Sequence, residues 1–315
     1  MSSPTHADAR QVLREAFGRE LREGVLLAPY TSARVGGPAD FLLLARSATE
    51  LDGVCRALWG LGMDFRMLGG GSNVLVADAG VRGVIVLNQA KEAEFTTDGD
   101  GAVVKAESGA SLGSVARRAV EQGLGGLEWA ATIPGTIGGA IVGNAGAFGG
   151  EVSQALKVAD ILQHPDRREH WLPERLEYGY RTSWLKHHPG KAVVLSGTFG
   201  LRTETRDAVR ARVAEFAARR QETQPSGASW GSMFKNPPGD YAGRLVEAAG
   251  LKGTRQGAAE ISARHANFFI NHGGATAADV WALIEKAREQ VLRQSGVELE
   301  LEIERLGQWN VTEVE

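Results

Sequence analysis

Cysteine is almost absent from this sequence, which has one, Cys55, among 315 residues. A single thiol cannot form a disulfide within the chain, so a small secreted scaffold held by disulfides is excluded. Cys55 falls on the apolar face of a predicted helix, and no base lies near it in the sequence. We therefore interpret it as a small core residue rather than a nucleophile.

Long apolar runs and a strong charge of one sign are also missing. No segment approaches the roughly 20 apolar residues that span a bilayer, and the first 24 residues are charged throughout, without a signal-peptide core. The net charge is −3 and the pI about 6.2, which does not favour general nucleic-acid binding. We expect a cytoplasmic protein with no membrane and no nucleic-acid partner, and we favour a monomer.

Several motifs of common catalytic sites do not occur. The sequence has no Walker A pattern and no G-x-G-x-x-G after a strand, so a Rossmann dinucleotide site is not expected. The adjacent His187 and His188 have no partners at metal-ligand spacing. We predict no metal site.

Glycine, by contrast, is plentiful, and it gathers in two segments. Residues 123–150 contain ten glycines set among buried-type apolar residues, and residues 69–73 read GGGSN between two apolar runs. Such glycines suggest backbone that passes close to a neighbour, with N–H groups suited to phosphate oxygens. We hypothesise that both segments hold one phosphorylated cofactor; the alternative is a pair of tight turns in a compact fold.

The length favours two domains or three small ones. We place a first α/β part at residues 1–90, a second at 91–205 and a third at 206–315. Helical spacing covers residues 51–58, 115–120, 209–217 and 280–291. Strands are predicted over residues 40–45, 64–68, 74–76, 84–87, 102–106, 156–163, 192–201, 267–271 and 297–304.

Three polar positions are candidates for chemistry. Arg181 follows two tyrosines in a short polar patch, where its planar fork could clamp a carboxylate, although a surface arginine is the common alternative. Ser232 lies in a Gly-Ser turn, where serine often only bonds the backbone. Glu302 is one of four glutamates on one face of the strand predicted over 297–304, and the pattern does not choose among the four.

Seven segments in one order resemble the UDP-N-acetylenolpyruvoylglucosamine reductase family. They are TSARVGGPA (31–39), LGGGSN (68–73), IPGTIGGA (133–140), NAGAFG (144–149), YRTS (180–183), GSMFKNP (231–237) and LELEI (299–303). The resemblance covers nearly the whole chain. The short segment between residues 183 and 192 resembles the shorter subclass, which lacks a substrate-closing loop.

The resemblance implies an α+β fold with the FAD-binding fold of the vanillyl-alcohol-oxidase (PCMH) type. Two α/β subdomains would hold FAD, and a C-terminal substrate-binding α/β domain would bind a UDP-sugar, with NADPH as co-substrate. The implied substrate contacts are Tyr180, Lys235 and Asn236. The implied cofactor contacts are Gly69, Gly70, Gly71, Ser72, Asn73, Thr132, Ile133, Pro134, Gly135, Thr136, Gly138, Gly139, Asn144 and Ala145.

The family's reaction implies roles for the three candidate residues. A hydride adds to C3 of the enolpyruvyl group of the substrate, and negative charge develops at C2 and spreads into the carboxylate. Arg181 and a protonated Glu302 would stabilise that charge. Ser232 would give C2 its proton, because an enolate carbon is basic enough to take one from a hydroxyl group in good geometry.

The chain departs from the family's commonest pattern at Tyr30, Phe148, Ala228 and Trp230, which bears on the substrate contacts more than on the catalytic residues. Two other hypotheses remain open. One is another FAD-dependent oxidoreductase of the same fold that acts on an alcohol or sugar, and the other is a catalytically silent flavin- or nucleotide-binding module.

Overall fold

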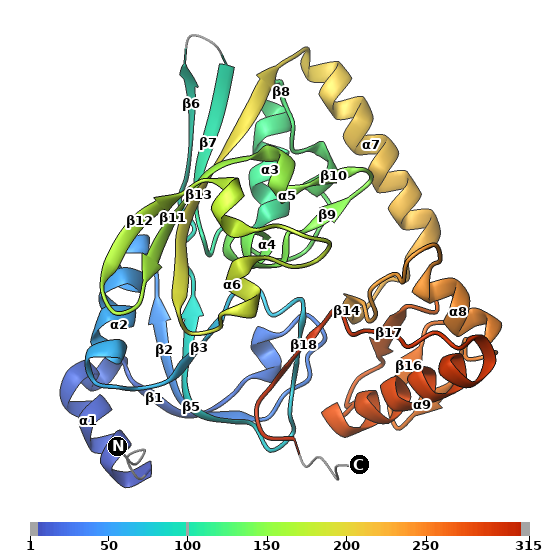
Figure 1. Cartoon of the computed structure of the whole chain (residues 1–315), viewed down its shortest axis with the longest axis horizontal. Coiled ribbons are helices and arrows are strands. Elements are labelled where there is room, and N and C mark those ends of the chain that lie inside the picture. The colour runs from blue at the N-terminus through green and yellow to red at the C-terminus, as the bar shows by residue number, and fades with distance from the viewer. Residues whose placement is uncertain (1–5, 99–100, 310–315) are drawn as a thin grey trace. The chain divides into compact units, whose positions relative to one another are not determined.

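A computed structural model describes residues 6–98 and 101–309 of the chain (Figure 1). The chain forms two compact units, and each is assembled from separate segments. Unit 1 takes the described residues up to Glu23, Phe41–Gly70 and Gly83–Ala218, and unit 2 takes Gly24–Asp40, Gly71–Arg82 and the residues from Arg219 on. The three-part division at residues 90 and 205 stays a prediction.

Unit 1 is built on a sheet in the order β12-β11-β13-β7-β6, with β8 paired to β13. All pairs along this order are antiparallel. The elements of unit 1 are α1 (His6–Phe17), α2 (Ala48–Gly60), β3 (Phe65–Leu68), β6 (Ala93–Asp98), β7 (Gly101–Glu107), α3 (Leu112–Glu121), β8 (Leu124–Gly125), α4 (Ile137–Gly143), β9 (Gly146–Ala147), β10 (Gly150–Glu151), α5 (Val152–Ala155), β11 (Leu156–Gln163), β12 (Arg167–Trp171), α6 (Trp184–His187) and β13 (Ala192–Thr203).

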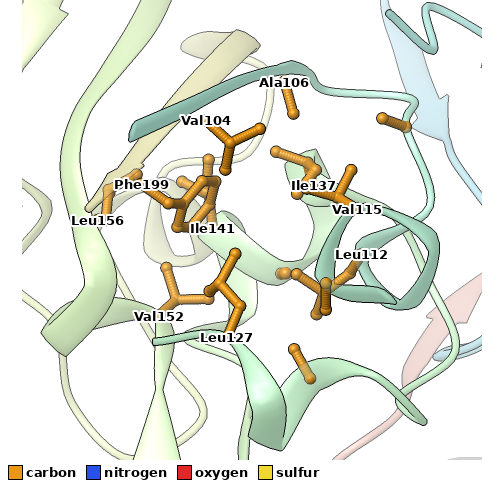
Figure 2. Close-up of a cluster of buried hydrophobic side chains, with 14 of the residues drawn as sticks. Val104, Ala106, Leu112, Val115, Leu127, Ile137, Ile141, Val152, Leu156 and Phe199 are labelled. Atoms are coloured by element: carbon orange, nitrogen blue, oxygen red, sulfur yellow. The ribbon is translucent and has the colours of Figure 1, made fainter. Parts of the chain in front are cut away.

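Apolar side chains cover both faces of this sheet. Helices α3, α4 and α5 lie on one face (Figure 1), where Ile137 and Ile141 of α4 pack with Val104 of β7 and Phe199 of β13 (Figure 2). The alternate residues of β11 and β13 join a second cluster with α2, which includes the fully buried Cys55. The prediction that Cys55 is a core residue is confirmed, and burial raises the pKa of its thiol to about 12.

A second sheet runs in the order β1-β2-β5-β3, and its strands precede the main sheet in the chain. Ser47 begins α2, with its hydroxyl group accepting the N–H of Glu50 at 3.1 Å. The Glu50 carboxylate accepts the N–H of Arg46 instead of that of Ser47, so a capping box is only half formed. Four elements cross the unit boundaries, namely β1 (Arg22–Leu26), β2 (Pro38–Ala45), β5 (Val81–Asn88) and α7 (Arg206–Thr223).

Unit 2 is a small antiparallel sheet in the order β14-β17-β16-β15, with α8 and α9 beside it (Figure 1). Its long helix α9 begins after Thr276, which forms a capping box with Asp279, and ends at Gly296 with φ 70°. The elements of unit 2 are β4 (Val74–Val76), β14 (Ala228–Ser232), α8 (Ala242–Ala248), β15 (Arg255–Gln256), β16 (Ala259–Ile261), β17 (Phe268–Asn271), α9 (Ala277–Ser295) and β18 (Glu304–Leu306).

The prediction of one strand over residues 297–304 is wrong. The apolar residues of the alternation are buried or half-buried, as expected, but only Leu301 forms a bridge, to Phe234, before β18 begins at Glu304. Strand β18 then pairs in parallel with β4. The alternation therefore predicted which side chains are buried, while the neighbouring backbone determined where a ladder could form.

No helix in the part of the chain that the structure describes has the length and hydropathy of a membrane span.

Candidate active site

The two glycine segments meet within unit 1. A Cβ added to Gly69 would lie 2.6 Å from Oγ1 of Thr136, and one added to Gly70 would lie 3.4 Å from Cα of Gly135. A side chain at Gly69 would therefore clash with the side chain of Thr136, whereas one at Gly70 would make an ordinary contact with Gly135. The missing side chain of Gly69 has a steric cause, since it lets residues 69–70 pack directly against residues 135–136.

The segment 132–136 contains polar groups that have no hydrogen-bond partner in the part of the chain that the structure describes. Within the described residues, the structure records no acceptor for the N–H groups of Gly135 and Thr136. In the same part of the chain the buried Oγ1 of Thr132 has no hydrogen-bond partner. Buried polar groups in folded proteins are nearly always paired, so the unpaired Oγ1 of Thr132 marks a place where a polar ligand could bind. The N–H groups of the half-buried Gly135 and Thr136 lie nearby in the sequence.

The other predicted cofactor residues of this loop have internal partners. The N–H groups of Ile133 and Gly138 donate to the carbonyl oxygens of Ala130 and Ser108, at 3.0 and 2.7 Å. Gly138 is needed for packing, because a Cβ there would lie 2.9 Å from Cβ of Ser108. The N–H of Gly139 makes only a long bond of 3.4 Å to Oγ1 of Thr136.

Asn144 connects the glycine-rich segment to the turn that carries Arg181. Its backbone is left-handed, with φ 45°, and its side chain is buried. The amide Nδ2 donates to the carbonyl oxygen of Gly179 at 3.0 Å, and Oδ1 accepts the N–H of Ser153 at 3.0 Å. The N–H groups of Asn144 and Ala145 both donate to the carbonyl oxygen of Ala140, so these two residues serve the protein's own structure.

Arg181 sits at the tip of a tight turn closed by the bridge between Gly179 and Thr182. Its φ of 57° is rare for a residue with a side chain, and such strain is concentrated at functional sites. Its Nη2 donates to the carbonyl oxygen of Gly146 at 2.7 Å, and its guanidinium lies 5.0 Å from the ring centre of Tyr180, which is 49% exposed. Ser183 supports the turn by donating to the carbonyl oxygen of Val142 at 2.6 Å.

The second half of the GGGSN turn belongs to unit 2. Gly71 has φ 59°, and a Cβ there would lie 2.2 Å from the carbonyl oxygen of Tyr30. Asn73 holds the segment around Glu302, since its Nδ2 donates to the carbonyl oxygen of Glu302 at 3.1 Å and its own carbonyl oxygen accepts the N–H of Glu304 at 2.8 Å. These contacts make Asn73 a structural neighbour of the Glu302 segment, whereas Gly71 packs against Tyr30.

One short ladder in unit 2 places the backbones of Ser232 and Glu302 close together. The N–H of Glu302 donates to the carbonyl oxygen of Met233 at 2.9 Å, and Phe234 is bridged to Leu301. Ser232 therefore lies one residue from the direct partner of Glu302. Both side chains are half-buried.

The structure distinguishes Glu302 from the other three glutamates. The side chains of Glu298 and Glu300 are 78% and 71% exposed, and Glu304 is exposed as well. Glu300 forms an ion pair with Lys235, and the N–H of Lys235 donates to the carbonyl oxygen of Glu300 at 2.8 Å. Glu302 is thus the member of the set whose side chain leaves bulk solvent.

The remaining predicted positions are placed as follows. Oδ1 of Asn236 accepts the N–H of Ala242 at 3.1 Å, at the start of α8. Trp230, a departure from the family pattern, is buried and donates from Nε1 to the carbonyl oxygen of Val74 at 3.0 Å.

Arg181 belongs to unit 1, whereas Ser232 and Glu302 belong to unit 2. The described residues contain no group of three or more His, Cys, Asp or Glu side chains that could hold a metal ion.

Comparison with known proteins gives a consistent result for both halves of the chain. Residues 39–163 match the model of an FAD binding domain, and residues 222–306 match that of the C-terminal domain of UDP-N-acetylenolpyruvoylglucosamine reductase. The chain is 43% identical over 296 residues to the UDP-N-acetylenolpyruvoylglucosamine reductase of Chloroflexus aggregans, covering 92% of this chain and 99% of that protein. It is 40% identical to reductase 2 of Symbiobacterium thermophilum, covering 97% of each. The crystal structure of the Thermus caldophilus reductase (MurB) is similar, with a TM-score of 0.76 and 36% identity over 91% of this chain and 99% of that one.

Proposed function

Because the chain belongs to the UDP-N-acetylenolpyruvoylglucosamine reductase family, we propose that it reduces UDP-N-acetylglucosamine enolpyruvate to UDP-N-acetylmuramate, with NADPH as reductant and FAD as cofactor. This reaction belongs to peptidoglycan precursor synthesis. The observation that carries the proposal is the extent of the likeness, which includes 99% of the Chloroflexus aggregans protein and therefore both of its domains. The expected α+β fold, with an FAD-binding domain and a reductase C-terminal domain, is confirmed.

The residues of unit 1 fit an FAD cofactor. The unpaired N–H groups of Gly135 and Thr136 and the unpaired Oγ1 of Thr132 belong to the segment that packs against Gly69 and Gly70. Bare N–H groups of this kind suit the oxygens of a pyrophosphate. When bound, FAD supplies the two-electron transfer from NADPH to the enolpyruvyl group.

The chain's own residues then have to manage charge and protons. Adding an electron pair at one end of the enolpyruvyl double bond leaves negative charge at the other end, which spreads into the carboxylate. The Arg181 guanidinium is suited to hold this carboxylate with two parallel hydrogen bonds. A protonated Glu302 would donate a further one.

Ser232 is the proposed proton donor. The product has a C–H bond at the carbon that became negative, so a donor must lie beside that carbon. The ladder that joins Met233 to Glu302 supports this role, because it holds Ser232 next to a group that acts on the same anion. Tyr180, Lys235 and Asn236 are proposed to contact the UDP-sugar. We further propose a cytoplasmic monomer in which residues 1–90, 91–205 and 206–315 serve as two FAD-binding parts and one substrate-binding part.

The test follows NADPH consumption by the FAD-loaded protein with and without UDP-N-acetylglucosamine enolpyruvate, each in air and without oxygen. We expect consumption that requires the sugar nucleotide and is unaffected by removing oxygen. Consumption that requires oxygen and ignores the sugar nucleotide would instead indicate an oxidase of the same fold. If the protein consumes no NADPH and binds no flavin, the catalytically silent module is the remaining hypothesis.

A further inference from the structure

Asn267, which precedes β17, forms three hydrogen bonds with the two residues that follow Ser232. Its side chain is 3% exposed. Its Oδ1 accepts the N–H of Phe234 at 2.9 Å, and its Nδ2 donates to the carbonyl oxygen of Phe234 at 2.8 Å. Its backbone carbonyl oxygen accepts the N–H of Met233 at 2.8 Å. No sequence motif pointed to this residue.

The side chain of Asn267 bonds the backbone of Phe234 beyond the end of the ladder between β14 and β17. Strands β14 and β17 pair irregularly between Ser229 and Ser232, where Gly231 has φ 74°, and their ladder ends at the pair Ser232 and Phe268. A side-chain amide has one acceptor and one donor group, like a peptide unit. Asn267 therefore extends the hydrogen bonding by one residue beyond the end of the ladder.

The opposite edge of the same segment is bonded to the Glu302 segment. The carbonyl oxygen of Met233 accepts the N–H of Glu302, and the N–H of Lys235 donates to the carbonyl oxygen of Glu300. Residues 233–235 are thus fixed on both edges, by Asn267 on one side and by residues 300–302 on the other. The position of Ser232 relative to Glu302 depends on this segment.

A neighbouring histidine fixes Asn267 in turn. Nδ1 of His265 accepts the N–H of Asn267 at 3.2 Å. Burial lowers the pKa of His265, so the ring is neutral and Nδ1 remains an acceptor. Phe268 packs edge-on against the same ring, with centroids 4.9 Å apart.

We propose that Asn267 is a positioning residue, which holds the 233–235 segment so that the Ser232 hydroxyl and the Glu302 carboxyl reach the same substrate carbon and carboxylate. The inference rests on the proposed roles of Ser232 and Glu302 and adds a residue to them. A displacement of about 1 Å at a reacting group can cost about 100-fold in rate. Asn267→Ala is therefore expected to slow the proton-dependent half of the reaction by about 10- to 100-fold.

The matched control is Asn271 on the same strand. It is also buried, and its side chain makes three hydrogen bonds, one to the carbonyl oxygen of Ala33 and two from the N–H groups of Gly273 and Ala275. None of them involves residues 232–235 or 300–302. Asn271→Ala therefore removes a comparable set of buried hydrogen bonds and leaves those of residues 233–235 in place.

The experiment measures the two half-reactions of FAD-loaded protein separately by rapid mixing, together with hydrogen exchange at the Phe234 amide. For Asn267→Ala we expect unchanged flavin reduction by NADPH, a slow reaction with the enolpyruvyl substrate and faster exchange at Phe234. For Asn271→Ala we expect both half-reactions and the Phe234 exchange to match wild type. If Asn267→Ala does not fold, Asn267→Gln keeps both the amide acceptor and the amide donor but displaces them by one methylene group, and it should show the same pattern more weakly.

A second arm combines Asn267→Ala with Ser232→Ala. If Asn267 acts by positioning Ser232 and Glu302, the loss caused by Asn267→Ala is smaller in the Ser232→Ala background than in wild type. A full additional loss in the double variant, or equal behaviour of Asn267→Ala and Asn271→Ala, would overturn the inference while leaving the proposed function intact. Wild-type speed in Ser232→Ala would remove Ser232 from the mechanism, and the inference would fall with it.

Discussion

Gly69→Ala tests the contact between the two glycine segments. The added Cβ would lie 2.6 Å from Oγ1 and 3.2 Å from Cγ2 of Thr136, whereas ordinary contacts begin at 3.4 Å. The backbones must separate by about 0.8 Å, because threonine is stiff at χ1 and its Oγ1 caps α4. Overpacking of this kind costs about 1–3 kcal/mol. If the segments separate in the FAD-free protein, FAD binding has to supply this free energy to bring them back together. The FAD affinity then falls by about 5- to 150-fold.

The assay is FAD titration of the apoprotein, followed by flavin fluorescence, together with thermal unfolding. Thr136→Ala removes both clashing atoms and leaves Cβ at 3.5 Å, so Gly69→Ala in that background should cost far less. Gly53→Ala is the control, since its Cβ meets nothing within 4 Å in the exposed middle of α2 and should stabilise the protein by about 0.5–1 kcal/mol. Equal cost of Gly69→Ala in both backgrounds, or no cost in either, would refute the packing of residue 69 against residue 136.

Two further predictions concern the stability of unit 1. Glu128 is buried and accepts hydrogen bonds from the Arg212 guanidinium of α7 and from the N–H of Gly126. Burial acts to raise the pKa of Glu128, but its backbone, Arg212 and Gly126 outweigh burial and lower it on balance. Because the pKa is lower in the folded state, the ionised carboxylate stabilises the fold at pH values above the unfolded-state pKa of about 4.3. This stabilisation is lost as the pH falls through the folded-state pKa. Glu128→Gln should therefore cost about 1.5–3 kcal/mol of unfolding free energy at pH 7, with the difference from wild type shrinking below about pH 4 in denaturant titrations. Cys55, with its buried thiol and pKa of about 12, should react with a thiol reagent only after unfolding; one equivalent consumed at once by the native protein would contradict its place in the core.

The elements that the sequence predicted well are those with long periodic patterns. Strand β11 has the predicted ends, Leu156 and Gln163, and the helical spacing predicted over residues 280–291 lies within α9. In both cases a run of buried side chains with one period coincides with local end signals. Where pattern and local signals agree, tertiary structure has little to add.

The sequence did not predict helix α4. Three of its seven residues are glycine, which disfavours a helix. The helix forms because Ile137 and Ile141 fill the core beneath it and Thr136 caps it, with Gly138 allowing close contact with Ser108. Tertiary packing of this kind is not visible in local sequence.

The candidate site was predicted in part for the same reason. The glycine segments, Arg181, Ser232 and Glu302 stand in recognisable motifs, so the resemblance found them. The bonds of Asn144 to Gly179 and of Asn267 to Phe234 join residues more than 30 positions apart, and no local pattern indicates either bond. The half-buried position of Glu302, in contrast to the exposed Glu298 and Glu300, likewise required the structure.

The most direct test of the central claim is the reaction of flavin-reduced Ser232→Ala protein with UDP-N-acetylglucosamine enolpyruvate, followed by rapid mixing without oxygen. A proton donor in the transition state contributes about 10²–10⁴-fold. We predict that this reaction slows by at least about 100-fold, while flavin reduction by NADPH keeps the wild-type rate. Reaction with the substrate at the wild-type rate would contradict the account.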